Sequence, residues 1–358
     1  MRFRDPDPPL IVVVGSGGVG KTTLGAALGV VSAEAGHDTL VMTFDPSHRL
    51  KDTLGVGEEA KERDVEVMAG TEGRLSAGLL DPRRTFDRLV ARYAPDEEAR
   101  DRILENRYYD QLAGSLAGIL EYMAVEKLYE AHREGGYRRI LLDTPPTRQA
   151  LDFLEAPSRI VGFLESGALR IALKPWFDEE GKLQAGPSWG FLRGRLERWL
   201  DEIVGLDLLR DMAEFFRAFG PLFDGFRQRA REVETLLRSE KTRFLLVAGP
   251  NEERIPDTLF FARKLREAQY HLGPVVVNRI HPRVSECPEA TSGRRLLSWE
   301  GEQDHRGLEQ LRELLPEEQL VTVPFLSREP TDLESLGELG AGIEEALTRF
   351  SASEKGGS

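Results

Sequence analysis

Residues 10–31 read LIVVVGSGGVGKTTLGAALGVV and join a strand, a glycine-rich turn and a helix in one stretch. The first five residues are apolar and mostly β-branched, which is typical of a strand buried on both faces of a sheet. After the turn, Leu24, Leu28 and Val31 recur at helical spacing. Between the strand and the helix, residues 15–22 match the pattern G-x-x-x-x-G-K-[ST], which predicts a loop that binds the phosphates of a nucleotide.

The glycines of this loop let backbone N–H groups turn inward toward phosphate oxygens, and the following helix adds the positive end of its dipole. Lys21 is expected to bridge the β- and γ-phosphates, the Thr22 hydroxyl to bind Mg²⁺, and Thr23 to contact the α-phosphate. A glycine-rich turn without a ligand is the alternative, which the flanking strand and helix disfavour. The nucleotide-binding residues predicted in this stretch are Gly15, Ser16, Gly17, Gly18, Val19, Gly20, Lys21, Thr22 and Thr23.

Two later strands end in residues that we expect to lie near the metal ion and near the base of the nucleotide. The apolar run RILLD at residues 139–143 ends in an acid, and Asp143 is the expected second residue on the Mg²⁺ side, acting through a metal-bound water. The alternative is an aspartate that only caps a turn. A late strand ends VNRIH at residues 277–281, where guanine-binding proteins of this class carry Asn-Lys-x-Asp. The missing aspartate favours ATP over GTP as the substrate.

Further apolar runs predict more strands and their order along the chain. They lie at residues 39–44, 65–68, 244–248, 275–277 and 320–323. Strands that alternate with helical patterns predict an α/β fold with a doubly wound, mostly parallel sheet of the P-loop NTPase type. The predicted division is an ATPase core over residues 1–154 and 236–350, with a helical segment at about 81–135, an inserted helical subdomain over 155–235 and a disordered tail over 351–358.

The insertion at residues 155–235 is rich in aromatic side chains, with eight of the seventeen phenylalanines and three of the four tryptophans. A stripe in it steps by three and four residues, as on one face of a helix: Leu209, Met212, Phe216, Phe219, Phe223 and Phe226. The stripe is either the core of the insertion or an exposed groove for an apolar helix. Adaptable grooves favour methionine, of which this stretch has one, although phenylalanine and leucine also serve.

Composition limits the classes of partner. The net charge of −13 repels phosphate backbones and argues against general nucleic-acid binding. A single cysteine excludes a disulfide or a cysteine-pair metal site within the chain. No apolar run approaches the roughly 20 residues of a membrane span, so no stable membrane insertion is expected and a cytoplasmic location is predicted.

The phosphate loop is followed by DPSHRLKD at residues 45–52 and by DTPPTRQAL at residues 143–151. These three segments together resemble the ArsA family, which includes the arsenite-pump ATPases and the tail-anchored-protein targeting ATPases. In that family the loop reads G-K-G-G-V-G-K-T-T, switch I reads D-P-A-H-S-L-S-D and switch II reads D-T-A-P-T-G-H-T-L. A helical insertion after switch II also agrees in placement.

The resemblance implies roles for the residues that match. Asp45 would orient or activate the water that attacks the γ-phosphate, while Asn278 and the backbone near Pro324 and Phe325 would hold the adenine. The resemblance also implies a homodimer that closes and opens with ATP binding and hydrolysis. In the targeting branch, closure forms an apolar groove for the transmembrane helix of a client protein.

The chain departs from the family in the loop, where Ser16 replaces the signature lysine that reaches the partner subunit's phosphates. Cations that act in this way contribute roughly 10³–10⁵ in rate, so hydrolysis is slow unless another cation substitutes. Arg148 and Arg49 lie in the two switches, where the family has Gly and Ser. Arg148 is the predicted replacement and joins Asp45 and Lys21 as a catalytic residue; a surface arginine is the alternative.

A second departure concerns sulfur ligands. Arsenite sites need several thiols, and the zinc of eukaryotic targeting ATPases uses a Cys-x-x-Cys pair, whereas this chain has Cys287 alone. The first prediction is therefore an Mg²⁺-dependent ATP hydrolase that handles a hydrophobic protein segment such as a transmembrane helix. The alternatives are a signalling or scaffold module with little hydrolysis, an arsenite-pump subunit, and a partitioning ATPase. Residues 333–350 lack the basic or bulky apolar helical face that the last class needs.

Overall fold

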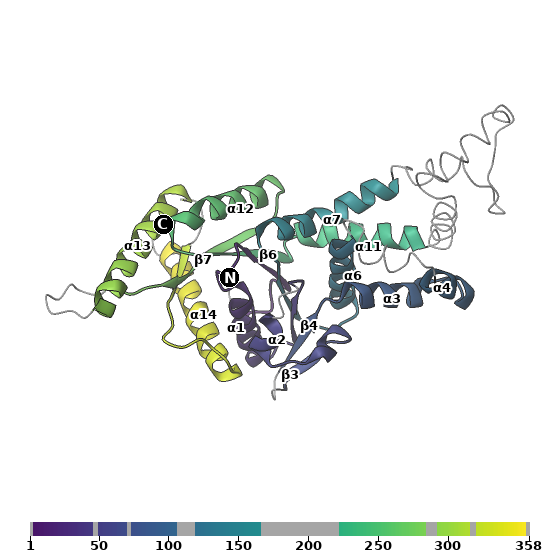
Figure 1. Ribbon diagram of the computed structural model, residues 1–358, viewed down its shortest axis with the longest axis horizontal. Helices are drawn as coiled ribbons and strands as arrows, with labels where there is room; N and C mark the ends of the chain where they lie inside the picture. Colours follow the sequence, from purple (N-terminus) through teal and green to yellow (C-terminus); the bar gives the residue numbers. More distant parts are fainter. Residues whose placement is uncertain are drawn as a thin grey trace, which may run out of the picture. The chain divides into compact units, whose positions relative to one another are not determined.

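The computed structural model describes residues 3–45, 49–69, 73–105, 119–165, 222–283, 292–315 and 320–355 (Figure 1). The chain divides into two compact units. Unit 1 comprises Met1–Leu80, Glu130–Asp152 and Thr235–Ser358, and unit 2 comprises Asp81–Tyr129 and Phe153–Glu234. The helical segment that we expected within the core, at about 81–135, thus groups mostly with the insertion in unit 2.

Unit 1 is built on an eight-stranded sheet in the order β3-β4-β2-β5-β1-β6-β7-β8. Its strands are β1 (Leu10–Gly15), β2 (Thr39–Thr43), β3 (Val65–Ala69), β4 (Arg74–Leu79), β5 (Arg139–Asp143), β6 (Thr242–Ala248), β7 (Leu272–Ile280) and β8 (Leu320–Pro324). Neighbouring strands are parallel, except for β3 and β4 at one edge. The predicted α/β fold with a mostly parallel sheet is confirmed.

Helices cover both faces of this sheet, as strands that are apolar throughout require. The unit 1 helices are α1 (Lys21–Glu34), α2 (Arg49–Leu54), α12 (Ile255–Glu267), α13 (Ser292–Leu314) and α14 (Leu333–Lys355), with short turns η1 (Glu58–Lys61) and η3 (Glu252–Arg254). On one face, α1, α2 and α14 share a core with alternate strand residues such as Val13, Val41 and Leu141. α12 contacts β1, β6 and β7 and contributes nothing to that core, so it covers the opposite face.

The contact between α1 and α14 is close enough to exclude a side chain. The two helices lie side by side (Figure 1), and a Cβ on Gly340 would come within 2.3 Å of the Ala27 carbonyl oxygen. α14 continues to Lys355. The tail predicted from residue 351 is therefore helical as far as 355, and residues 356–358 lie outside the described part.

The register of the parallel strands assembles the site. Val13 of β1 lies beside Asp143 of β5 and Leu245 of β6, and Thr43 of β2 also lies beside Asp143. Because the carboxyl ends of parallel strands meet at one edge of a sheet, the ends of β1, β2 and β5 lie together.

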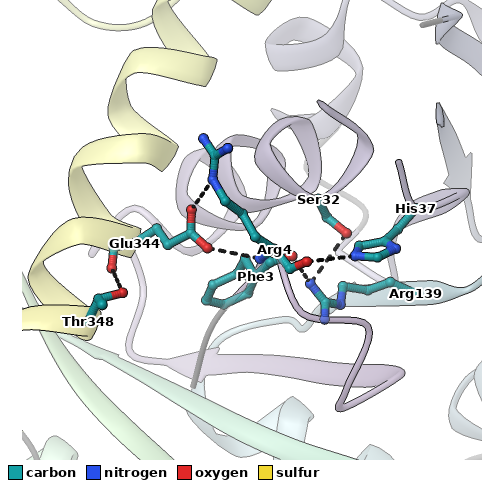
Figure 2. Close-up of polar contacts among 7 residues, drawn as sticks. All are labelled: Phe3, Arg4, Ser32, His37, Arg139, Glu344 and Thr348. Atoms are coloured by element: carbon teal, nitrogen blue, oxygen red, sulfur yellow. Dashed lines mark hydrogen bonds and ion pairs between the residues drawn. The ribbon is translucent and has the colours of Figure 1, made fainter. Parts of the chain in front are cut away.

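At the opposite end of β5, the N-terminal segment is tied to the sheet by an arginine (Figure 2). Arg139 is fully buried and donates to the backbone carbonyls of Phe3 and Asp5. Arg4 pairs with Glu344 of α14 at 2.9 Å. Burial lowers the pKa of Arg139 to about 10, so the guanidinium keeps its charge at neutral pH. These contacts bind residues 3–5 to β5 and α14.

Unit 2 is helical where it is described. The helices that contribute to it are α3 (Pro82–Tyr93), α4 (Glu97–Leu104), α6 (Ile119–Arg133), α7 (Thr147–Glu165) and α11 (Phe223–Arg238). Asp81 and Asp96 cap α3 and α4 by accepting backbone N–H bonds. Most of the aromatic stripe predicted over residues 209–226 lies outside the described residues, so core and groove both stay predictions. Among the described helices, none has the length and apolar character needed to cross a bilayer.

Candidate nucleotide-binding site

The predicted phosphate loop connects β1 to α1 and is shaped by its glycines. Gly18 and Gly20 have φ angles of 74° and 94°, in the left-handed region that side chains with a Cβ disfavour. A Cβ on Gly15 would lie 2.1 Å from the Val247 carbonyl oxygen, and one on Gly20 would lie 2.4 Å from the Asn278 amide nitrogen. Backbone conformation and close packing by β6 and β7 therefore both require the glycine pattern.

Lys21 lies at the start of α1 and points back into the loop. Its Nζ donates to the carbonyl oxygens of Gly15 at 3.1 Å and Ser16 at 3.0 Å, and the residue is only 6% exposed. Burial lowers the pKa of Lys21, while the carboxylates of Asp143 and Asp45 oppose the shift. A buried ammonium group in a loop of this shape suits the anionic oxygens of a polyphosphate.

Asp143 joins the loop to a neighbouring strand. The Thr22 hydroxyl donates to its Oδ2 at 2.7 Å and the Thr43 hydroxyl to the same oxygen at 3.1 Å. Oδ1 is buried and has no hydrogen-bond partner within the described residues. Burial raises the pKa of Asp143 to about 6, although Thr22 and Lys21 act in the opposite direction. The carboxylate thus keeps one oxygen available for a ligand.

The segment that resembles switch I begins directly after β2. The backbone N–H of Asp45 donates to the Thr43 hydroxyl at 3.1 Å, so Thr43 lies between Asp45 and Asp143. Residues 46–48 lie outside the described part of the chain. Arg49 is exposed at the start of α2.

The segment that resembles switch II lies against the loop. A Cβ on Gly17 would lie 3.8 Å from the Pro146 side chain. Two residues later, Arg148 is exposed in the first turn of α7. Its predicted role toward a phosphate stays a prediction.

The residues predicted to hold the adenine belong to β7 and β8 or directly follow β8. Asn278 is buried and donates from Nδ2 to the Val19 carbonyl at 2.8 Å. Pro324 ends β8, and the Phe325 ring, 49% exposed, stacks on His281 with centroids 4.4 Å apart. The structure brings Asn278 to the loop and Phe325 to the same end of β7, and base binding by these residues stays a prediction.

Comparison with known proteins points to one family. A family model described as an anion-transporting ATPase, ArsA ATPase, matches residues 9–179. ATPase get3 of Neurospora crassa is 28% identical over 332 residues, which cover 91% of this chain and 87% of that protein. ATPase ARSA2 of Chlamydomonas reinhardtii is 26% identical over 349 residues, which cover 92% and 86%. These matches support the ArsA-type ATPase family for this chain.

An ArsA-type ATPase implies Mg²⁺, and the residues present fit this ion. Mg²⁺ prefers oxygen ligands and keeps several waters. The Thr22 hydroxyl and the Asp143 carboxylate are oxygen donors 2.7 Å apart, and Asp143 has a buried oxygen without a partner in the described chain. When bound, Mg²⁺ neutralises charge on the β- and γ-phosphates.

Several polar residues of this site were given no role by the sequence pattern. Thr43 was missed, although its place at the end of a strand, two residues before Asp45, is a usable signal. His281 was given no role, whereas its ring stacks on Phe325. Arg254 carries no signal at all, because it belongs to none of the three motifs.

Proposed function

We propose that this ArsA-type ATPase is an Mg²⁺-dependent ATP hydrolase that works as a nucleotide-switched homodimer on a hydrophobic protein segment, such as a transmembrane helix. The observation that supports the switch is the shared contact at Asp143. Thr22 of the loop and Thr43 of β2 donate to the same carboxylate oxygen, and the Asp45 backbone donates to Thr43. Consecutive hydrogen bonds therefore link the loop with the starts of both switch segments.

The proposed reaction is an in-line displacement. A water oxygen bonds to the γ-phosphorus, the bond to the β–γ bridging oxygen breaks, and ADP leaves with that electron pair. Lys21 holds the β- and γ-phosphate oxygens, and Asp45 orients the water and accepts its proton. Thr22 and Asp143 hold the metal, the latter through water. There is little covalent work for the protein, so catalysis depends on positioning and electrostatics.

Phosphate release tests the hydrolytic role. Asp45→Asn removes the charge and keeps the size, and we expect it to slow steady-state phosphate release roughly 100-fold or more. Asp52→Asn, at an exposed position of α2, is the matched control and should release phosphate like the parent. Equal release by Asp45→Asn and the parent would disprove the role given to Asp45.

The client is proposed from the relatives and the composition. Curated relatives carry the name GET3, including one of Chaetomium globosum that is 28% identical over 91% of this chain. Residues 155–235, which the sequence predicts to form a helical insertion, are rich in aromatic side chains. The test is capture of a transmembrane-helix peptide with and without Mg-ATP, with Lys21→Ala as the control. Capture that is equal without nucleotide would reject a switched groove.

A scaffold module with little hydrolysis is the second candidate, and Ser16 favours it. This residue stands where the family's signature lysine acts, and its hydroxyl is buried without a partner among the described residues. If the parent protein binds ATP but releases phosphate as slowly as Asp45→Asn does, the protein is a scaffold module and the hydrolase hypothesis is rejected.

A further inference from the structure

Two arginines from outside the three motifs bind the phosphate loop. Arg254 donates from Nη1 to the Gly17 carbonyl at 2.5 Å, and Arg279 donates from Nη1 to the Gly18 carbonyl at 3.2 Å. Two guanidinium groups therefore hold consecutive peptide units of the segment that surrounds the phosphates.

The position of Arg254 is built by the connection between β6 and α12. Its backbone N–H donates to the Asn251 carbonyl at 2.9 Å, and its carbonyl accepts from the Thr258 hydroxyl at 3.0 Å. A Cβ on Gly249 would lie 2.8 Å from Arg254 Cδ, so the glycine leaves room for the side chain to reach the loop. A half-buried side chain with a fixed backbone and a close-packed stem is held more firmly than an ordinary surface arginine.

Arg279 is held from the neighbouring strand. It has a φ of 64°, and its backbone N–H donates to Asn278 Oδ1 at 2.9 Å. Its Nη2 also lies 3.8 Å from the Glu329 carboxylate, and both of these side chains are exposed. This shared and more solvated guanidinium supplies less charge to the loop than Arg254 does.

The placement has an electrostatic consequence for the loop. In a trans peptide the C=O and N–H point in opposite directions. A cation on the Gly17 carbonyl therefore lies behind the Gly18 N–H, which in a phosphate loop faces the ligand. Its charge adds to the peptide dipole and raises the positive potential where phosphates bind, more strongly than it would in bulk water.

Position 16 does not supply this charge. The Ser16 side chain is neutral and buried, and Arg148 and Arg49 are exposed in the two switch segments. We propose that Arg254, assisted by Arg279, is a loop cation of this ATPase and adds positive charge beside the γ-phosphate bound in its own subunit. The lysine that Ser16 replaces would instead act on the phosphates of the partner subunit. The inference rests on the proposed binding of ATP in this loop. Arg254 acts through the loop peptide and is a positioning residue.

The test separates charge from anchoring. Arg254→Gln keeps a donor for the Gly17 carbonyl without the charge, and Arg254→Lys keeps the charge. Calorimetry would give the Kd for Mg²⁺ with a non-hydrolysable ATP analogue and for Mg-ADP, and phosphate release at saturating ATP would give kcat. Arg263→Ala, at an exposed arginine of the following helix α12, is the matched control.

For Arg254→Gln we expect the Kd for the ATP analogue to rise about tenfold or more and the Kd for ADP about threefold or less, because the γ-phosphate carries the extra negative charge. Arg254→Lys should stay within about threefold of the parent for both nucleotides. The kcat of Arg254→Gln should fall while that of Arg263→Ala is unchanged.

Three results would overturn the inference. They are unchanged binding by Arg254→Gln, an equal loss for ATP analogue and ADP, and a loss in Arg254→Lys as large as in Arg254→Gln. The last two indicate a structural anchor, and a matched thermal unfolding curve for each variant excludes misfolding. A parent protein that binds neither nucleotide would instead overturn the proposed function, so the two failures are distinguishable.

Discussion

At the scale of single residues, Asp143 has two carboxylate oxygens in different surroundings. Oδ2 accepts from Thr22 and Thr43, whereas Oδ1 is buried without a partner within the described chain. An unpaired buried charge is costly unless a cation compensates it. Asp143 therefore lowers the stability of the protein without a ligand and raises its affinity for a metal ion.

Asp143→Asn should stabilise the protein without nucleotide and weaken binding of Mg-ATP. Because burial raises the pKa of Asp143 from 3.8 to about 6, the charged form costs about 1–3 kcal/mol at neutral pH, and the amide removes that cost. Urea unfolding of the parent and the variant measures the gain. Thr85→Val, a buried threonine of unit 2, controls for general effects of losing a polar group.

The same substitution has a defined pH dependence. A carboxyl with a raised folded pKa costs nothing below its unfolded pKa, and the cost grows as pH rises from about 4 to about 6. The gain from Asp143→Asn should therefore be about half as large at pH 5 as at pH 7.5. A gain that does not change with pH would show that the charge of Asp143 is not its cause.

At the scale of elements, the contact between α1 and α14 depends on a glycine. Gly340→Ala should destabilise unit 1 by about 1–3 kcal/mol, because its Cβ would meet the Ala27 backbone 2.3 Å away and force the helices apart. Gly342→Ala on the same helix meets nothing within 4 Å, so helix propensity should stabilise it by up to about 1 kcal/mol. Chemical denaturation of both variants checks the pair. Equal changes in stability for the two variants would show that the close approach of α1 and α14 at Gly340 is not the cause.

Within unit 2, α6 and α11 are joined by a buried ion pair. Glu126 and Arg229 lie 2.6 Å apart with side chains 2% and 7% exposed. Glu126→Leu should cost about 3–5 kcal/mol because it leaves the guanidinium buried without its carboxylate. The double variant Glu126→Leu with Arg229→Met should recover most of this loss, as measured by hydrogen exchange in α6 and α11. A double variant that is no more stable than the single one would contradict this account.

At the scale of the whole molecule, the proposed switch requires two chains. With Mg²⁺ and a non-hydrolysable ATP analogue, sedimentation should show a species of about twice the 40.1 kDa chain. Lys21→Ala loses the predicted phosphate contact, so the mass of its sedimenting species should not change when nucleotide is added. A parent that keeps one mass with and without nucleotide would reject a nucleotide-controlled dimer.

The amino-acid sequence by itself determined the parts of this protein that depend on local pattern. Apolar runs predicted the strands of the sheet except β4, and the glycine spacing of residues 15–22 predicted the phosphate loop, because both follow from conformational preferences of neighbouring residues. The three motifs also predicted the ArsA-type family, whose model matches residues 9–179.

Only the tertiary structure decided which distant residues meet at the loop. Thr22 and Asp143 are 121 positions apart, and Gly17 and Arg254 are 237 apart. These contacts follow from the order β2-β5-β1-β6-β7, which places the carboxyl ends of separate strands at one edge. Strand order is set by packing of the whole sheet and its helices, so the local sequence around Arg254 does not predict its contact with the loop.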